Sequence, residues 1–171
     1  LQRIVSSDQV LLGFSDAGAH LRNMAHYNFP LRMLKLVQDS HRAGAPIMSL
    51  EKAVWRLTKE LADWHGIQVG HIYQGARADL VLIDPARPDA GLEQIHQESM
   101  ERFNGHRRLV RRNDDAVPMV IVGGKIAFEN GQFSAVVGRK RLGQFLQART
   151  CAVAGTKKAI RSEEIPEAAA A

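Results

Sequence analysis

The chain has 171 residues, enough for one domain with a sizeable core, and 23 Lys and Arg against 18 Asp and Glu give a formal net charge of +5. This charge does not indicate a nucleic-acid partner, because basic residues are mixed with acidic ones and the densest group, Arg107–Arg112, has no interleaved aromatic side chain. No apolar run approaches the length of a membrane span and no signal segment is visible, so we expect no membrane partner and, with a single cysteine, Cys151, a cytoplasmic protein.

The first predicted element is a short buried strand, Val10–Leu12, followed by Gly-Phe-Ser-Asp-Ala-Gly-Ala-His at residues 13–20. This order puts the carboxylate of Asp16 and the imidazole of His20 at the carboxyl end of a strand, where barrels and open α/β sheets build their sites. From the residues alone an alternative stays open, in which Asp16 caps a helix or forms a turn and His20 is a satisfied polar residue. The strand has no partner strand before it and the chain opens at Leu1 without a methionine, so we expect a piece of a larger protein.

Two helical regions follow. Apolar residues at helical spacing predict a helix from Pro30 to Gly44, with the proline near its first position. A second helix is predicted from the N-cap Ser49 to Gly66, with a possible break at Thr58. One side of this second helix carries an unbroken apolar stripe that should face the protein core, formed by Leu50, Val54, Leu57, Leu61 and Trp64. We expect both tryptophans, Trp55 and Trp64, to pack in that core.

The second half of the chain indicates a β-unit. Strands are predicted at residues 80–83, 119–122 and 125–129, and the Asn130-Gly131 pair predicts a hairpin into residues 132–137. Residues 86–116 are polar with few periodic signals, which favours an irregular surface excursion. A short helix is predicted at residues 140–148, and we expect the tail from Gly155 to be loosely ordered.

The order of these segments resembles the C-terminal end of amidohydrolase-superfamily enzymes. The resemblance is carried by Ser-Asp-Ala-Gly-Ala-His at residues 15–20, Trp-Arg-Leu-Thr at 55–58, and the glycine, spacer, glycine, Ala-Asp-Leu-Val pattern at 70–81. Arg-Arg-Leu-Val at 107–110 and the glycine turns at 123–124 and 130–131 look like the branch of N-acyl-D-amino-acid deacylases (D-aminoacylases). The match covers residues 8–148 in the order of the family.

Three departures from the family pattern stand out. Leu61 occupies the place of a usual proline, and Val137-Gly138-Arg139 stands where the family tends to have Pro-Gly-Arg. Both changes concern local backbone stiffness. The strands that carry the metal-binding histidines of the family would lie upstream of Leu1.

The resemblance implies an α/β fragment in three parts. Residues 1–68 would be the last strand and helices of a TIM-like (β/α)8 metal-dependent hydrolase barrel. Residues 69–138 would form part of a small accessory β-sandwich, with an irregular insertion at 86–116, and residues 139–171 a C-terminal helix and tail.

The resemblance also implies zinc-dependent hydrolysis of an amide C–N bond in a small-molecule substrate, an N-acyl-D-amino acid. Zinc lowers the pKa of its bound water toward about 7, and a carboxylate then takes the proton from that water and passes it to the leaving amine. Asp16 matches the family residue with this role, which sometimes also contacts the metal. Ser15 and His20 are substrate-binding candidates, although turn chemistry and hydrogen bonding within the segment explain them equally well.

The remaining histidines have no partner histidine at ligand spacing, and we expect none to bind catalytic metal. Arg107 and Arg108 suit a carboxylate-bearing substrate, but a surface role is the preferred interpretation. We expect the isolated chain to be inactive and to form a homo-oligomer that hides apolar edges. Two other functions stay open: a non-catalytic interaction or dimerisation domain, and a cyclic-amide hydrolase (dihydroorotase- or hydantoinase-like) of the same superfamily.

Overall fold

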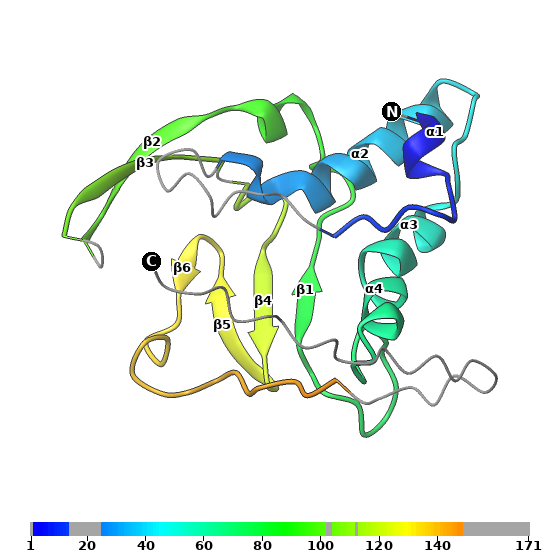
Figure 1. Ribbon diagram of the computed structural model, residues 1–171. Helices are drawn as coiled ribbons and strands as arrows, with labels where there is room; N and C mark the ends of the chain where they lie inside the picture. The colour runs from blue at the N-terminus through cyan, green and yellow to red at the C-terminus, as the bar shows by residue number, and fades with distance from the viewer. Residues whose placement is uncertain (1, 14–24, 102–103, 112, 149–171) are drawn as a thin grey trace, which may run out of the picture.

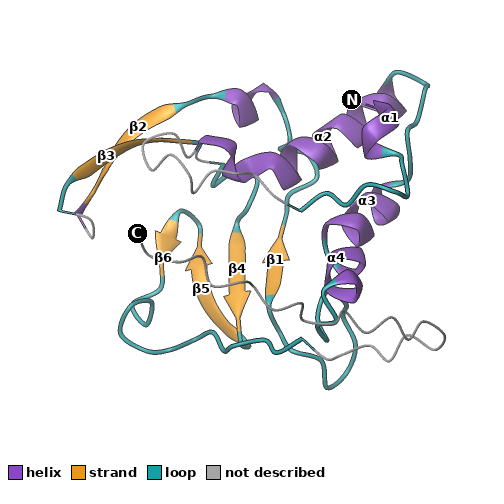
Figure 2. Ribbon diagram, viewed as in Figure 1, coloured by secondary structure: helices purple, strands orange, loops and turns teal. Residues whose placement is uncertain are grey.

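The computed structural model describes residues 2–13, 25–101, 104–111 and 113–148. These residues form an α/β structure in which helices α2 (Phe29–Arg42), α3 (Leu50–Leu57) and α4 (Lys59–Trp64) gather along the top and one side of a four-stranded sheet (Figure 1). A separate two-stranded hairpin lies beyond the N-terminal end of α2 (Figure 2). No helix among the described residues is both long and apolar enough to cross a membrane.

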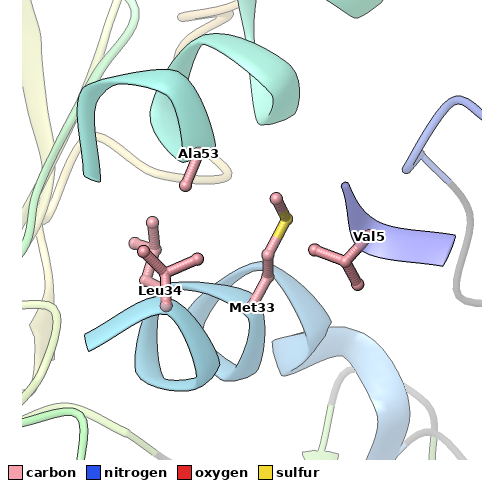
Figure 3. Packing of buried hydrophobic residues seen from close by; sticks show 5 residues of the cluster. Val5, Met33, Leu34 and Ala53 are labelled. Atoms are coloured by element: carbon pink, nitrogen blue, oxygen red, sulfur yellow. The ribbon is translucent and has the colours of Figure 1, made fainter. Parts of the chain in front are cut away.

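Helix α2 (Phe29–Arg42) is the central helix of the core. It begins one residue before the predicted start, with Pro30 in its first turn, and Gly44 follows its end with a φ of 70°. Its buried side chains face α1 (Gln2–Val5) and α3 (Leu50–Leu57), where Val5, Met33, Leu34, Val37 and Ala53 form one apolar cluster (Figure 3). The predicted helix is therefore confirmed.

The second predicted helix is broken at Thr58, as its sequence suggested. Ser49 caps α3, because its Oγ accepts a hydrogen bond from the Lys52 amide at 3.1 Å. At Thr58 the backbone leaves helical geometry, with φ −129° and ψ −82°, and α4 (Lys59–Trp64) follows. Thr58 itself caps nothing: its hydroxyl donates back to the Val54 carbonyl at 2.7 Å.

The predicted burial of the two tryptophans is wrong. Trp55 is 39% exposed and Trp64 is 67% exposed. Helix α3 meets the core through Ala53, with Leu50 and Leu57 packed beside it, and α4 buries Ala62, so both tryptophans lie off the core-facing side of their helices. The Trp55 ring lies 4.1 Å from the Lys52 ammonium, and Trp64 stands edge-on to the His65 ring.

The predicted strands pair into one antiparallel sheet. Its order is β1 (Leu80–Leu82), β4 (Met119–Val122), β5 (Lys125–Glu129) and β6 (Gln132–Phe133), so β6 is shorter than the predicted 132–137. Asn130 and Gly131 both have positive φ, 48° and 82°, which is the backbone of a two-residue hairpin turn. The turn chemistry in the sequence thus located the β5–β6 hairpin correctly.

The prediction that residues 86–116 are irregular is wrong. They contain a 3-10 turn, η2 (Ala90–Glu93), and an antiparallel hairpin of β2 (His96–Met100) and β3 (His106–Val110). Most described side chains of its two strands are polar, so these strands lack the apolar alternation that normally signals a strand. A hairpin alone is marginally stable in water, and this one is anchored at its base, where Leu92 and Ala116 pack against Leu31 of α2.

Two other predicted elements are absent from the described residues. Val10–Leu12 is an irregular, half-buried segment instead of a strand, because no neighbouring strand offers its backbone a ladder of hydrogen bonds. Residues 140–148 run without a helix, and they include Gly143, which disfavours one, and Phe145, which is 88% exposed. The described sheets are antiparallel, so the barrel and the β-sandwich stay predictions, and the tail from Gly155 lies outside the described residues.

The β5–β6 turn gives a direct test of the sheet. Replacing Gly131 with alanine should lower the free energy of unfolding by about 1–2 kcal/mol, because a side chain at positive φ is strained. Chemical denaturation measures this change. Gly143→Ala is the matched control, since nothing lies within 4 Å of its added carbon. Equal effects of the two substitutions would contradict the turn geometry.

Candidate functional site

The three predicted site residues, Ser15, Asp16 and His20, lie outside the described residues. The structure does describe the chain on both sides of them, up to Gly13 and again from Ala25. Each of these flanking segments is held by a buried polar side chain. These two anchors are the features of the candidate site that the described residues provide.

Arg56 of α3 holds the segment before residue 14. Its side chain is fully buried, and its two terminal nitrogens donate hydrogen bonds to the backbone carbonyls of Val5 and Val10. Its Nε donates to the Glu60 carboxylate of α4 at 3.0 Å. One guanidinium therefore joins the N-terminal segment to both halves of the broken helix.

The Arg56–Glu60 pair is costly to bury, and the hydrogen bonds that all three guanidinium nitrogens donate offset this cost. Taking both charges out of water carries a desolvation penalty that the ion pair and the two carbonyl acceptors offset. Removing one partner of such a buried pair typically costs about 3–5 kcal/mol, because the other charge is left uncompensated. The path of the chain from Val5 to Val10 is thus tied to this pair.

Close packing also holds the chain at Gly13, the last described residue of the N-terminal segment. An added carbon on Gly13 would lie 3.1 Å from the Leu61 side chain of α4. Leu61 occupies the place where the resembled family has a proline, and here its side chain contacts the backbone just ahead of Ser15. The leucine in place of the proline therefore affects the packing of the backbone that leads to Ser15.

Asn28 holds the segment after residue 24. It is buried at the end of η1 (Ala25–Asn28), and its Nδ2 donates to the Leu92 carbonyl at 2.7 Å and to the Asn113 Oδ1 at 3.0 Å. Its own Oδ1 accepts a hydrogen bond from Arg111 at 3.3 Å. Asn28 therefore ties the start of α2 to both ends of the segment that carries the β2–β3 hairpin.

Glu93 reinforces the same junction. Its carboxylate accepts a hydrogen bond from Arg32 of α2 at 2.8 Å and pairs with Arg111 at 3.4 Å. The Arg111 side chain is largely buried, whereas half of the Glu93 side chain is exposed, so solvent still screens this pair in part. The hairpin is thus fastened to α2 by charge as well as by apolar contact.

The glycine, spacer, glycine, Ala-Asp-Leu-Val pattern has a structural explanation. Gly70 has a φ of 81° and packs against the helix break, where an added carbon would lie 2.8 Å from the Lys59 nitrogen. Asp79 accepts a hydrogen bond from the Gly123 amide at 2.7 Å and pairs with Arg77, which ties the start of β1 to the β4–β5 turn. Burial raises the pKa of Asp79, but the hydrogen bonds from Arg77 and Gly123 outweigh it and leave that pKa below its usual value.

The described residues do not fit a zinc ion. No group of three His, Cys, Asp or Glu side chains within them could hold a metal. A zinc centre in this protein would need ligands from other parts of the chain or of a longer protein.

Sequence reasoning missed Arg56 and Asn28 as anchors. A charged residue between Ala53 and Leu57, followed four positions later by Glu60, was a readable sign of a buried ion pair. Asn28 gave no comparable sign, because its partners lie 64 and 85 positions away in the sequence.

Comparisons with known proteins add to this description. Uncharacterized proteins of Mycobacterium tuberculosis (strain H37Rv) and Mycobacterium bovis are 50% identical over 133 residues, which is 78% of this chain and 22% of theirs. The 5'-deoxyadenosine deaminase of Methanococcus aeolicus is 27% identical over 124 residues, 72% of this chain and 27% of the enzyme. No protein-family model matches the chain.

Among solved structures, a D-aminoacylase described as defining a novel subset of amidohydrolases is 25% identical, with 70% of this chain and 21% of that chain covered. Its TM-score of 0.44 is too low to establish a shared fold. The deaminase likeness supports the amidohydrolase superfamily. The chain spans about a fifth to a quarter of the length of these proteins.

The Asn28 anchor predicts a stability effect. Asn28→Ala should lower the free energy of unfolding by about 1–3 kcal/mol, because the Leu92 carbonyl loses a buried donor. It should also speed proteolytic cleavage of the β2–β3 hairpin. Gln97→Ala, on the exposed surface of β2, is the control, and equal cleavage rates in the two variants would contradict the anchoring role.

Asp79 predicts a pH effect. A carboxylate whose pKa is lower in the folded state adds stability above its ordinary pKa of 3.8, and this contribution is lost as the pH falls through the folded value. The stability difference between wild type and Asp79→Asn should therefore shrink below about pH 4. Thermal melts between pH 3 and 7 measure it. A difference that stays constant over this range would refute the prediction.

Proposed function

We propose that this chain is the C-terminal part of a longer, metal-dependent amidohydrolase that cleaves an amide C–N bond, with an N-acyl-D-amino acid as substrate. The observation that carries the proposal is the sequence likeness to the deaminase over 72% of the chain, together with the order of the family-like segments. The contact between Gly70 and the Thr58–Lys59 backbone supports it, because two of these segments meet in space.

Amide hydrolysis defines the role that we assign to Asp16. Attack on an amide carbonyl needs a base that removes a proton from the water nucleophile, and collapse of the intermediate needs an acid that protonates the leaving nitrogen. One carboxylate can do both in turn, since the proton gained in the first step is donated in the second. Asp16 is this group in the proposal, and Ser15 and His20 contact the substrate beside it.

The zinc ligands of this proposal lie largely outside the chain. Within the chain, Asp16 is the proposed metal contact, and the described residues supply no ligand set. The isolated chain should accordingly be inactive.

One observation favours an interaction role beside the catalytic one. Several large apolar side chains are well exposed, among them Ile72 at 85%, Phe133 at 66% and Phe145 at 88%. Such surfaces suit contact with the rest of a longer protein or with a second copy. The expected homo-oligomer stays a prediction.

Asp16→Asn in the full-length protein tests the proposal. Hydrolysis of N-acetyl-D-amino acids should fall about 10²–10⁴-fold, because the variant cannot shuttle the proton. The metal content, measured by elemental analysis, should match wild type. Asp63→Asn is the control, because Asp63 is exposed and contacts Lys59 on the same helix.

Wild-type turnover in the Asp16→Asn variant would refute the assigned role. Absence of both bound metal and hydrolysis in the wild-type protein would favour the non-catalytic interaction domain. Turnover of cyclic amides in place of N-acyl amino acids would favour the hydantoinase-like alternative.

A further inference from the structure

We propose that Arg56 is a positioning residue for the proposed hydrolysis: its guanidinium fixes the backbone that leads into the Asp16 segment. The inference rests on the proposed function for its catalytic consequence. Its structural part concerns described residues only.

The hydrogen bonds of Arg56 fix two points of the N-terminal segment. Val5 ends α1, and Val10 begins the irregular segment that runs to Gly13. The carbonyls of both residues accept from the same planar guanidinium, through different nitrogens. A planar fork with fixed donor directions sets the separation and orientation of its two acceptors.

The other polar contacts of this segment are local or exposed: the Val10 amide donates to the Ser7 carbonyl at 3.4 Å, and the exposed Asp8 carboxylate lies 3.9 Å from the Lys52 ammonium. Val10–Gly13 belongs to no strand, so its backbone is not aligned by a ladder of hydrogen bonds. Val5 and Leu12 pack into the apolar cluster of α2 and α3, which holds the segment in place. Apolar contact is not directional, whereas the Arg56 hydrogen bonds define where the carbonyls point.

Glu60 orients Arg56 in turn. It accepts from Nε, the remaining edge of the guanidinium, and its own side chain is 12% exposed. Because Glu60 lies beyond the break at Thr58, the guanidinium is held from both α3 and α4. A displacement of α3 or α4 would therefore shift the backbone at Val5 and Val10, which lies ahead of Asp16.

The test uses Arg56→Lys and Glu60→Gln in the full-length protein, with two readouts. Hydrogen–deuterium exchange of peptides covering residues 2–13 reports the local backbone. Steady-state kinetics on N-acetyl-D-amino acids separates kcat from KM. Arg42→Lys and Asp63→Asn are the matched controls, because both residues form exposed ion pairs on neighbouring helices.

Lysine keeps the charge but cannot reach both carbonyls with one rigid fork. In Arg56→Lys, we expect exchange in residues 2–13 to rise at least fivefold and kcat to fall at least tenfold, with KM changed less than threefold. Glu60→Gln should change both in the same direction by a smaller factor. The controls should match wild type.

The proposal is overturned if Arg56→Lys folds and leaves exchange in residues 2–13 unchanged. It is also overturned if exchange rises while kcat stays within twofold of wild type. If Arg56→Lys does not fold, Glu60→Gln decides by the same criteria. Failure of the proposed function is separate, because it shows as wild-type turnover in Asp16→Asn, whereas the exchange measurement does not depend on catalysis.

Discussion

The buried guanidinium of Arg56 is the interaction on which the N-terminal half of the structure depends. A positive charge without solvent exposure is tolerated only when each side of it meets an acceptor, and here the acceptors come from three segments: the end of α1, the irregular stretch at Val10, and α4. The charge therefore dictates the arrangement of its neighbours. Loss of any one of them would leave part of the desolvation cost unbalanced.

A second buried polar group fixes the opposite flank of residues 14–24. Asn28 uses both amide hydrogens on acceptors from the segments that begin and end the β2–β3 hairpin, and Glu93 adds an ionic contact to α2. The hairpin is therefore attached to the same helix that follows the candidate site residues. In the proposed enzyme, both sides of the Asp16 segment are thus held by directional hydrogen bonds as well as by packing.

Local chemistry made part of this fold predictable from sequence. Ser49, Pro30 and the Asn130-Gly131 pair each act through their own backbone or a near neighbour, so their helix and turn positions could be predicted directly. The errors arose where distant partners decide. Val10–Leu12 has strand-like composition but pairs with no strand among the described residues, and the β2–β3 hairpin carries polar residues even at half-buried positions such as Glu98 and Arg108. The prediction that the tryptophans are buried was wrong for a similar reason, since Ala53, with Leu50 and Leu57 beside it, makes the contact with α2.

The site residues Ser15, Asp16 and His20 stay predictions, because they lie outside the described residues. The Asp16 carboxylate and the His20 imidazole could be identified as candidates from the sequence, because they lie in a segment of small residues. The deaminase likeness supports the superfamily. The spacing of Arg56 and Glu60 indicated an ion pair, but the partners of Asn28 and the Val5 acceptor of Arg56 could not be predicted, because they are distant in sequence.

The central claim is that the Asp16 carboxylate faces a metal-lined cavity in a longer hydrolase. An experimental structure of the full-length protein, grown with zinc, tests it most directly. The account predicts density for a metal beside the Asp16 carboxylate, with its other ligands supplied by residues upstream of Leu1. A structure in which the Asp16 side chain caps a helix, away from any metal, would contradict it.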